Sequence, residues 1–306
     1  MPFLPYARLL RLPNVFTAFA DIALGLCVAL GVSSVVVDGE FALRAALLFL
    51  ASGCLYCAGM VWNDYFDLEE DRRERSFRPL PSGKISLRRA KGIGAVLVVV
   101  GYACAVLSGF HGDDWQPTAT IIGGLLVVAV LLYDARIKRT PFGPIGMAVC
   151  RFLNVLLGLT LIDISLISWG TRLHLASAVG IYIVGVTWFA RTEEKRSKPE
   201  VLRAAVGVML IALLIALAVP LRVPVGTSSV FFPYLLVVFA FWIGVPAVKA
   251  IRKPTPQYVQ AGVKRCILGL VGLDALLATV FVGTPGLFIL LLLPPALLIG
   301  KWVYST

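Results

Sequence analysis

The sequence is poor in charge and in histidine. Asp, Glu, Lys and Arg make up only 15% of its 306 residues, where soluble domains carry about 25%, which argues against a soluble enzyme. The two histidines, His111 and His174, have no histidine neighbour, which argues against a zinc or haem centre. The chain is instead apolar: 59% hydrophobic residues and a mean hydropathy of +0.89 are typical of a protein that crosses a membrane several times.

Acidic residues are scarce as well, and 17 Asp and Glu against 28 Lys and Arg leave a net charge of +11. Membrane topology and anionic lipid or substrate account for this excess, so it predicts no nucleic-acid partner. Six cysteines are scattered through apolar stretches; Cys54 and Cys57 match a redox or zinc spacing only formally, and we interpret them as packing residues. With no soluble domain, low-complexity tract or clear repeat, residues 1–306 are predicted to form one integral-membrane domain.

Long apolar runs recur along the whole chain. A hydrocarbon core requires about 20 apolar residues per helix, and lipid offers the backbone no hydrogen-bonding partner, so each run is predicted to be a helix. The last two runs are separated only by residues 283–286 and form either a tight hairpin or one irregular element. We therefore expect an all-α, polytopic membrane bundle of nine to ten transmembrane helices. The predicted spans are 14–33, 41–62, 92–110, 117–133, 143–164, 173–190, 201–221, 229–248, 266–283 and 286–302.

Lysine and arginine are distributed unevenly between the two sides of these spans. Arg44, Arg172 and Arg222 lie on one side, and the position of Lys301 depends on the number of spans. The other 24 of the 28 fall in the N-terminal segment and in alternate loops, which the positive-inside rule makes cytoplasmic. No small-residue cleavage site stands out near the N-terminus, so the first span is expected to be retained.

A dense carboxylate cluster follows directly on the apolar run 41–62. Its members are three or four residues apart, so they share one face if the helix continues. Hard oxygen ligands in this array suit Mg²⁺, and arginines just beyond, Arg78 among them, offer bidentate partners for a diphosphate. The alternative is a solvated loop, first acidic and then basic. The cluster consists of Asn63, Asp64, Asp67 and Asp71.

Further polar residues fall on the same predicted side. Lys138 is placed as a point-charge phosphate ligand, and Tyr133 sits where its hydroxyl reaches water or substrate, unless it belongs to an aromatic belt. Arg151 and Asn154 lie inside the fifth span, and an arginine in an apolar helix normally faces a cavity or a partner. We therefore favour a binding role over a snorkelling side chain for Arg151.

Three polar clusters meet the membrane edge on this side, at 63–84, 133–154 and 191–198. They converge on one pocket if the spans close into a ring. Asn14 and Asp21 share a face of the first span, and Asp274 lies within the ninth. Such intramembrane groups are candidates for partners of an arginine.

The carboxylate cluster, followed by Arg78-Pro79-Leu80-Pro81-Ser82-Gly83, resembles the first signature of the UbiA superfamily of intramembrane prenyltransferases. Residues 12–17 and 133–140 add to the resemblance, and span number and motif placement extend it over most of the chain. The chain is similar to a divergent branch, the EboC-like proteins of bacterial secondary-metabolite operons, more than to the quinone enzymes. The resemblance implies a helical bundle around a central cavity that opens to lipid and is capped by cytoplasmic loops.

The resemblance also implies an activity and a site. The activity is Mg²⁺-dependent transfer of a prenyl group from an isoprenyl diphosphate to an aromatic or other lipophilic acceptor within the membrane. Asn63, Asp64, Asp67 and Asp71 are assigned to the metal–diphosphate site. The residues predicted to be catalytic are Asp67, Asp71, Tyr133 and Lys138. Those predicted to bind substrate are Asn14, Asn63, Arg78, Lys138, Arg151, Asn154 and Arg191.

The second acidic motif departs from the family pattern. Two aspartates with about three residues between them are expected after the sixth span, where this chain has Thr192-Glu193-Glu194-Lys195. Glu193 and Glu194 either serve a second Mg²⁺ with their longer side chains, or that ion is weakened or lost. One alternative is therefore a UbiA-like protein that binds or carries a prenyl or lipid ligand. Another is a transferase of the CDP-alcohol phosphotransferase kind, although residues 63–83 lack its glycine and alanine–arginine elements.

Overall fold

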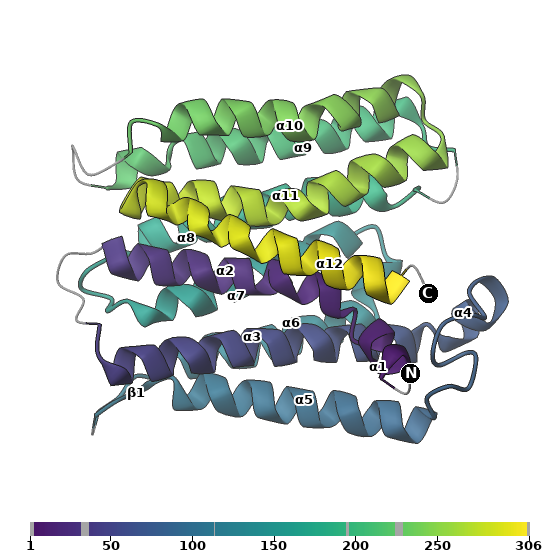
Figure 1. The fold of residues 1–306 in the computed structure, drawn as a ribbon, viewed down its shortest axis with the longest axis horizontal. Coiled ribbons are helices and arrows are strands. Elements are labelled where there is room, and N and C mark those ends of the chain that lie inside the picture. The colour runs from purple at the N-terminus through teal and green to yellow at the C-terminus, as the bar shows by residue number, and fades with distance from the viewer. Residues whose placement is uncertain (1–2, 32–36, 113, 194–195, 224–228, 305–306) are drawn as a thin grey trace.

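The computed structural model describes residues 3–31, 37–112, 114–193, 196–223 and 229–304, and helices dominate these ranges (Figure 1). The β-structure in these ranges is one pair of two-residue antiparallel strands. In chain order the elements are α1 (Leu4–Leu9), α2 (Leu12–Gly31), α3 (Gly39–Phe66), α4 (Leu68–Glu74), α5 (Leu87–Leu107), β1 (Phe110–His111), β2 (Asp114–Trp115), α6 (Thr118–Ala135), η1 (Ile137–Arg139), α7 (Gly143–Gly158), η2 (Leu159–Leu161), α8 (Trp169–Ala190), α9 (Pro199–Leu217), η3 (Val219–Arg222), α10 (Phe232–Arg252), α11 (Pro256–Val282), η4 (Thr284–Leu292) and α12 (Leu293–Tyr304).

Ten helical segments among the described residues are long and apolar enough to cross a membrane. The prediction of an all-α, polytopic membrane protein is confirmed. Of the predicted nine to ten spans, the structure has ten among the described residues. Of the two alternatives for the last two runs, the structure shows the hairpin, with two separate spans. Gly283, at a φ of +68° that favours glycine, makes the hairpin, and the tenth span begins as the 3₁₀ segment η4 before becoming α12.

Several helices extend beyond the predicted spans. α11 begins at Pro256, ten residues before the predicted start at 266, and α5 begins at Leu87, where Ser86 caps it by accepting a hydrogen bond from Arg89 N–H. Hydropathy detects only the stretch that lies in lipid, whereas helix formation continues through the polar turns at its end. The predicted boundary 92 is wrong for the same reason.

The helices are arranged as an inner ring with outer covers. Helices α2, α3, α6, α7, α8 and α11 contribute the residues that line a central cavity. Outside them, α9 and α10 flank one side of the bundle, α5 flanks the opposite side, and α12 lies against α2 (Figure 1). The ring closure on which convergence of the three polar clusters depends is therefore present.

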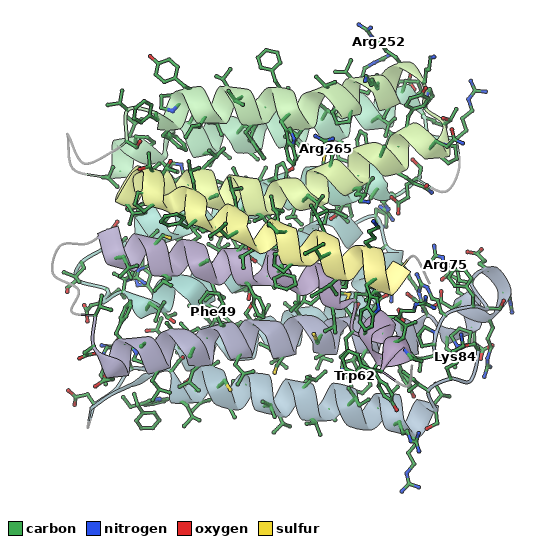
Figure 2. All side chains as sticks on the ribbon, in the orientation of Figure 1. Phe49, Trp62, Arg75, Lys84, Arg252 and Arg265 are labelled. Carbon is green, nitrogen blue, oxygen red and sulfur yellow. The ribbon has the colours of Figure 1, made fainter. Side chains whose placement is uncertain are left out.

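Both chain ends and α4 lie at one end of the bundle (Figure 1). Arg8 Nε donates to the carbonyl of Val303 at 2.9 Å, which joins the two ends of the chain directly. Arg75, Lys84 and Arg252 lie toward the same end (Figure 2). We call this end of the molecule the polar mouth, because the carboxylate cluster also lies there.

Candidate active site

The polar mouth begins where α3 ends. Asp67 terminates α3 with a φ of −91° and a ψ of 5°, and α4 starts at the next residue. The assumption that the helix continues through the cluster is therefore wrong. Helical hydrogen bonding nevertheless continues across the break, since Asp67 N–H donates to Asn63 O at 3.0 Å and Asp71 N–H to Asp67 O at 2.8 Å. The spacing of the cluster survives, but its carboxylates are divided between two groups of cations.

The first group is organised by Arg78. Its Nη1 lies 2.7 Å from Asp71 Oδ2 and 3.5 Å from Asp64 Oδ1, so one guanidinium joins two buried carboxylates. Arg78 is held in place by a compact loop: Ser82 Oγ donates to its carbonyl, and Leu80 and Ile85 are buried against α1, α3 and α5. The Arg78–Gly83 motif therefore places a cation over the carboxylates.

The second group surrounds Asp67. Lys138 Nζ lies 2.7 Å from Asp67 Oδ2, and Arg139 Nη2 lies 3.0 Å from Oδ1. Both cations come from η1, the short turn that follows α6. The same Lys138 ammonium donates to Asn63 O at 3.3 Å. The structure thus brings together the first and second predicted clusters.

Arg11 joins the mouth to the interior. Its Nη2 donates to Asn63 Oδ1 at 3.3 Å and to Asp64 Oδ1 at 3.2 Å, and the residue also lines the central cavity. Arg11 has a φ of +46°, a left-handed conformation that is strained for a residue with a side chain. Such strain is most common at functional sites, and here it lies in the turn between α1 and α2.

The central cavity has a volume of about 410 Å³. Most of its wall is apolar, with residues such as Leu55, Met60 and Leu126, and it is bordered by Asn14, Tyr133, Asp134, Arg151, Asn154 and Glu193. The predicted residues Asp64, Asp67, Asp71, Arg78 and Lys138 lie outside this lining, on the mouth side. Asn63 Nδ2 donates to Asp134 Oδ1 at 3.2 Å and so connects the two regions.

A second polar network lies on the cavity wall at membrane depth. Arg151 of α7 donates to Asp21 Oδ2 at 3.2 Å and to Thr17 Oγ1 at 2.6 Å, and its guanidinium lies over the ring of Tyr56. Asn154 Nδ2 donates to the same Asp21 oxygen at 2.7 Å. The expectation that Asp21 is the partner of an arginine is met, and Arg151 faces a cavity.

The third predicted cluster is only partly at the site. Glu193 lines the cavity. Arg191 does not: its guanidinium donates to the carbonyls of Thr140 and Pro141, which ties the end of α8 to the segment after η1. Its predicted substrate contact gains no support from this placement. Glu194 lies outside the described residues.

Three residues of the site were not predicted from the sequence: Arg11, Asp134 and Arg139. Asp134 carried a usable signal, because it is an acid directly after an apolar span, close to the pattern of Asp21 and Asp274, which are acids inside one. Arg139 follows Lys138 directly and could have been included with it. Arg11 carried no local signal, since its role depends on the turn that brings it over α3.

The donor set of the mouth suits Mg²⁺ in its chemistry, since the oxygens belong to carboxylates and to an amide. Among the described residues, no three His, Cys, Asp or Glu side chains are grouped closely enough to form a metal cage. The carboxylates are instead paired with arginine and lysine. Binding a cation at Asn63, Asp64, Asp67 and Asp71 therefore requires that they exchange part of those pairings.

Comparison with known proteins decides the family. The profile of the UbiA prenyltransferase family matches residues 22–263, most of the chain. The chain belongs to the UbiA prenyltransferase family. The resemblance drawn from the first signature is thus confirmed, as is the prediction that the chain is a member of a prenyltransferase family. Membership of a secondary-metabolite branch stays a prediction.

Curated relatives share parts of the chain. The digeranylgeranylglyceryl phosphate synthase of Saccharolobus solfataricus is 31% identical over 155 residues, 50% of this chain and 50% of that protein. The synthase of the same name from Methanococcoides burtonii is 38% identical over 97 residues, 32% of this chain and 31% of that protein. The chain thus spans half the length of the first relative and about a third of the second.

Solved structures share the fold. A digeranylgeranylglyceryl phosphate synthase structure has a TM-score of 0.65 at 20% identity and covers 92% of this chain and 99% of its own. A UbiA homologue from Archaeoglobus fulgidus bound to GPP and Mg²⁺ has a TM-score of 0.56 at 16% identity, covering 87% of this chain and 99% of that one. At these identities the likeness shows the UbiA fold.

Proposed function

We propose that this chain is a Mg²⁺-dependent intramembrane prenyltransferase, which transfers a prenyl group from an isoprenyl diphosphate to a lipophilic acceptor. The observation that carries the proposal is the junction of a charged mouth with an apolar cavity of about 410 Å³. Arg11 and Asp134 border both regions. A diphosphate bound among the cations of the mouth would have its prenyl chain directed into the cavity.

The residues of the mouth have distinct parts in this chemistry. Asn63, Asp64, Asp67 and Asp71 would hold Mg²⁺, which neutralises charge on the leaving diphosphate. Arg78 and Lys138, at present paired with these carboxylates, would turn to the phosphate oxygens as the carboxylates bind the cation. Negative charge develops on the diphosphate as the carbon–oxygen bond breaks, and fixed positive charge beside it stabilises that transition state.

The cavity protects the allylic cation that this bond cleavage produces. Its wall of Leu55, Met60, Leu126 and Val130 excludes water, which would otherwise capture the cation. The rings of Tyr133 and Tyr56, both on the cavity wall, offer aromatic faces to positive charge. The network of Arg151, Asn154 and Thr17 places polar groups deeper in the cavity, where they can orient an acceptor.

The name of the curated relatives suggests an acceptor to test first. Their name, digeranylgeranylglyceryl phosphate synthase, points to a hydroxyl-bearing prenylglyceryl phosphate as acceptor. We propose this lipid as the first acceptor to offer, beside the aromatic acceptors that the family resemblance suggests. We also propose that the mouth faces the cytoplasm, in agreement with the distribution of lysine and arginine.

The proposal is tested by diphosphate release from geranyl, farnesyl and geranylgeranyl diphosphates. The purified protein in lipid is assayed with Mg²⁺ and then with EDTA, over the acceptor panel. We expect release that requires Mg²⁺ and falls by roughly 100-fold or more in Asp67→Ala and in Asp71→Ala. Glu70→Ala is the matched control, because this exposed carboxylate of α4 lies beside the cluster and should leave release unchanged.

Two outcomes would count against the proposal. Normal turnover in a well-folded Asp67→Ala or Asp71→Ala protein would remove the metal assignment. Tight binding of a donor without release by the wild-type protein would instead support the alternative, a UbiA-like protein that binds or carries its ligand. Replacement of the second acidic motif by Thr192-Glu193-Glu194-Lys195 would then be the first cause to test.

A further inference from the structure

Asp134 is a carboxylate on the cavity wall to which neither the sequence motifs nor the metal site assigns a task. It lies in the last turn of α6, next to Tyr133, and is only 2% exposed. Asp134 lines the cavity, whereas Asp64, Asp67 and Asp71 lie outside the cavity lining, in the polar mouth. A carboxylate that borders an apolar cavity is within reach of whatever the cavity holds.

The surroundings of Asp134 differ from those of the other carboxylates at this end. Asp64, Asp67 and Asp71 each lie within 3.5 Å of an arginine or lysine nitrogen. Among the described residues Asp134 forms no ion pair, and the hydrogen bond it accepts comes from the neutral amide of Asn63. Lys138, four residues on, donates instead to Asp67 and to Asn63 O. Asp134 thus combines two features that Asp64, Asp67 and Asp71 lack: it borders the cavity, and no cation lies within ion-pairing distance of it among the described residues.

The geometry also distinguishes the two oxygens of Asp134. Oδ1 accepts the Asn63 hydrogen bond, and the amide of Asn63 is oriented because its own Oδ1 accepts from Arg11. Oδ2 faces Gly59, which borders the same cavity: a Cβ atom at Gly59 would lie 3.7 Å from Oδ2. The bare backbone at this position leaves the approach to Oδ2 open.

We propose that Asp134 is the general base of the transfer, an inference that rests on the proposed function. The C1–O bond of the donor breaks and its electron pair leaves with the diphosphate. An electron pair of the acceptor forms the new bond to C1, and the proton that the acceptor loses moves to Asp134 Oδ2. The paired carboxylates of the mouth serve the metal–diphosphate, and the unpaired one serves the acceptor. Roles divide in this way where neighbouring carboxylates have different environments.

The inference is tested with the substitution Asp134→Asn. The amide introduced there keeps an oxygen that can accept the hydrogen bond from Asn63 Nδ2. Two quantities are compared in lipid nanodiscs: prenylated product, and binding of the geranylgeranyl diphosphate donor and of Mn²⁺ as a spectroscopic probe for Mg²⁺. Loss of a general base slows the step by about 100-fold or more. We expect product formation to fall by that factor, while both dissociation constants stay within about threefold, because the metal and the diphosphate are assigned to the mouth and the substitution keeps the hydrogen bond from Asn63.

A second pair of variants keeps the inference testable if Asp134→Asn folds poorly. Asp134→Gly removes the carboxylate and leaves room for formate, which we expect to restore product formation at least about tenfold, as an added base does when the native one is missing. Formate should not restore Asp67→Gly, whose carboxylate is assigned to the metal. Rescue of this kind does not follow from a purely structural role.

Three results would overturn the inference. Product formation by Asp134→Asn within threefold of wild type would show that no base is needed there. A loss of Mn²⁺ or donor binding in proportion to the loss of product would place Asp134 in the metal–diphosphate site. Wild-type protein that neither releases diphosphate nor forms product would remove the proposed function, and the role of Asp134 with it.

Discussion

Asp21 and Asp274 are two fully buried carboxyl groups that meet between α2 and α11. Asp21 Oδ2 accepts from Arg151 and Asn154, but Asp21 Oδ1 and both oxygens of Asp274 accept nothing from a donor among the described residues. Two adjacent ionised carboxylates at membrane depth would repel each other at high cost. The arrangement is satisfied if Asp274 carries a proton and donates it to Asp21, which then balances the charge of Arg151.

This protonation state predicts opposite results for two similar substitutions. Asp274→Asn replaces a neutral acid by a neutral amide that can donate to Asp21, so we expect stability to change by less than about 1 kcal/mol. Asp21→Asn leaves the partly buried Arg151 guanidinium without its counter-charge, and we expect a loss of about 3 kcal/mol. Thermal unfolding of the two variants in one detergent makes the comparison. Equal losses would show that Asp274 is ionised.

At the scale of elements, the site depends on how helices end and cross. The bend at Asp67 turns α4 so that Asp71 is buried against Arg78, while Glu69 and Glu70 remain exposed. The short turn η1 then brings Lys138 and Arg139 to Asp67. Helix ends, more than helix faces, assemble the mouth.

The crossing of α2 and α7 sets the position of the Arg151 network. Gly25 and Gly158 meet there so closely that a Cβ at Gly25 would lie 2.2 Å from the carbonyl carbon of Gly158. The backbones are in contact because neither residue has a side chain. Asp21 and Asn154, each one helical turn away along its own helix, are thereby brought within hydrogen-bonding distance.

Gly25→Ala is therefore expected to be harmful although it adds a single methyl group. Separating the two backbones costs roughly 1–3 kcal/mol through overpacking and weakens the Asp21–Asn154 contact. We expect a lower thermal midpoint and reduced product formation. Gly92→Ala, at a helical glycine with open space around it, is the matched control and should lower neither, because alanine favours helix over glycine. A Gly25→Ala protein as stable as wild type would mean that the helices can separate without loss.

For the whole molecule, the number of spans decides its topology. Ten spans return the chain to the side from which it starts, in agreement with the contact between Arg8 and Val303. Lys301 then joins the 24 residues already assigned to that side, so 25 of the 28 lysines and arginines lie there. By the positive-inside rule, this asymmetry supports the proposal that the polar mouth faces the cytoplasm.

Cysteine labelling checks this orientation. Lys84→Cys lies in the mouth loop and Ile164→Cys in the connection between η2 and α8, and both positions are exposed. In intact cells a membrane-impermeant maleimide should label Ile164→Cys and leave Lys84→Cys unmodified until the cells are opened. Four native cysteines are buried and two are partly buried, so the unsubstituted protein measures the background. The reverse labelling pattern would invert the topology.

The sequence by itself determined the membrane class, the helical spans, the uneven distribution of charge and the first carboxylate signature. These properties are local: apolar length selects a spanning helix, and a spacing of three or four residues places Asn63, Asp64, Asp67 and Asp71 near one another. Family membership followed from the same residues and was confirmed by the profile match.

Only the tertiary structure decided which cation pairs with which carboxylate. Arg78 joins Asp64 to Asp71, η1 delivers two cations to Asp67, and Asp134 is left with the amide of Asn63. These pairings depend on a helix bend, on a strained turn at Arg11 and on backbones in contact at a glycine crossing. Each arises from packing between segments distant in the chain, and residue spacing along one helix carries no information about it.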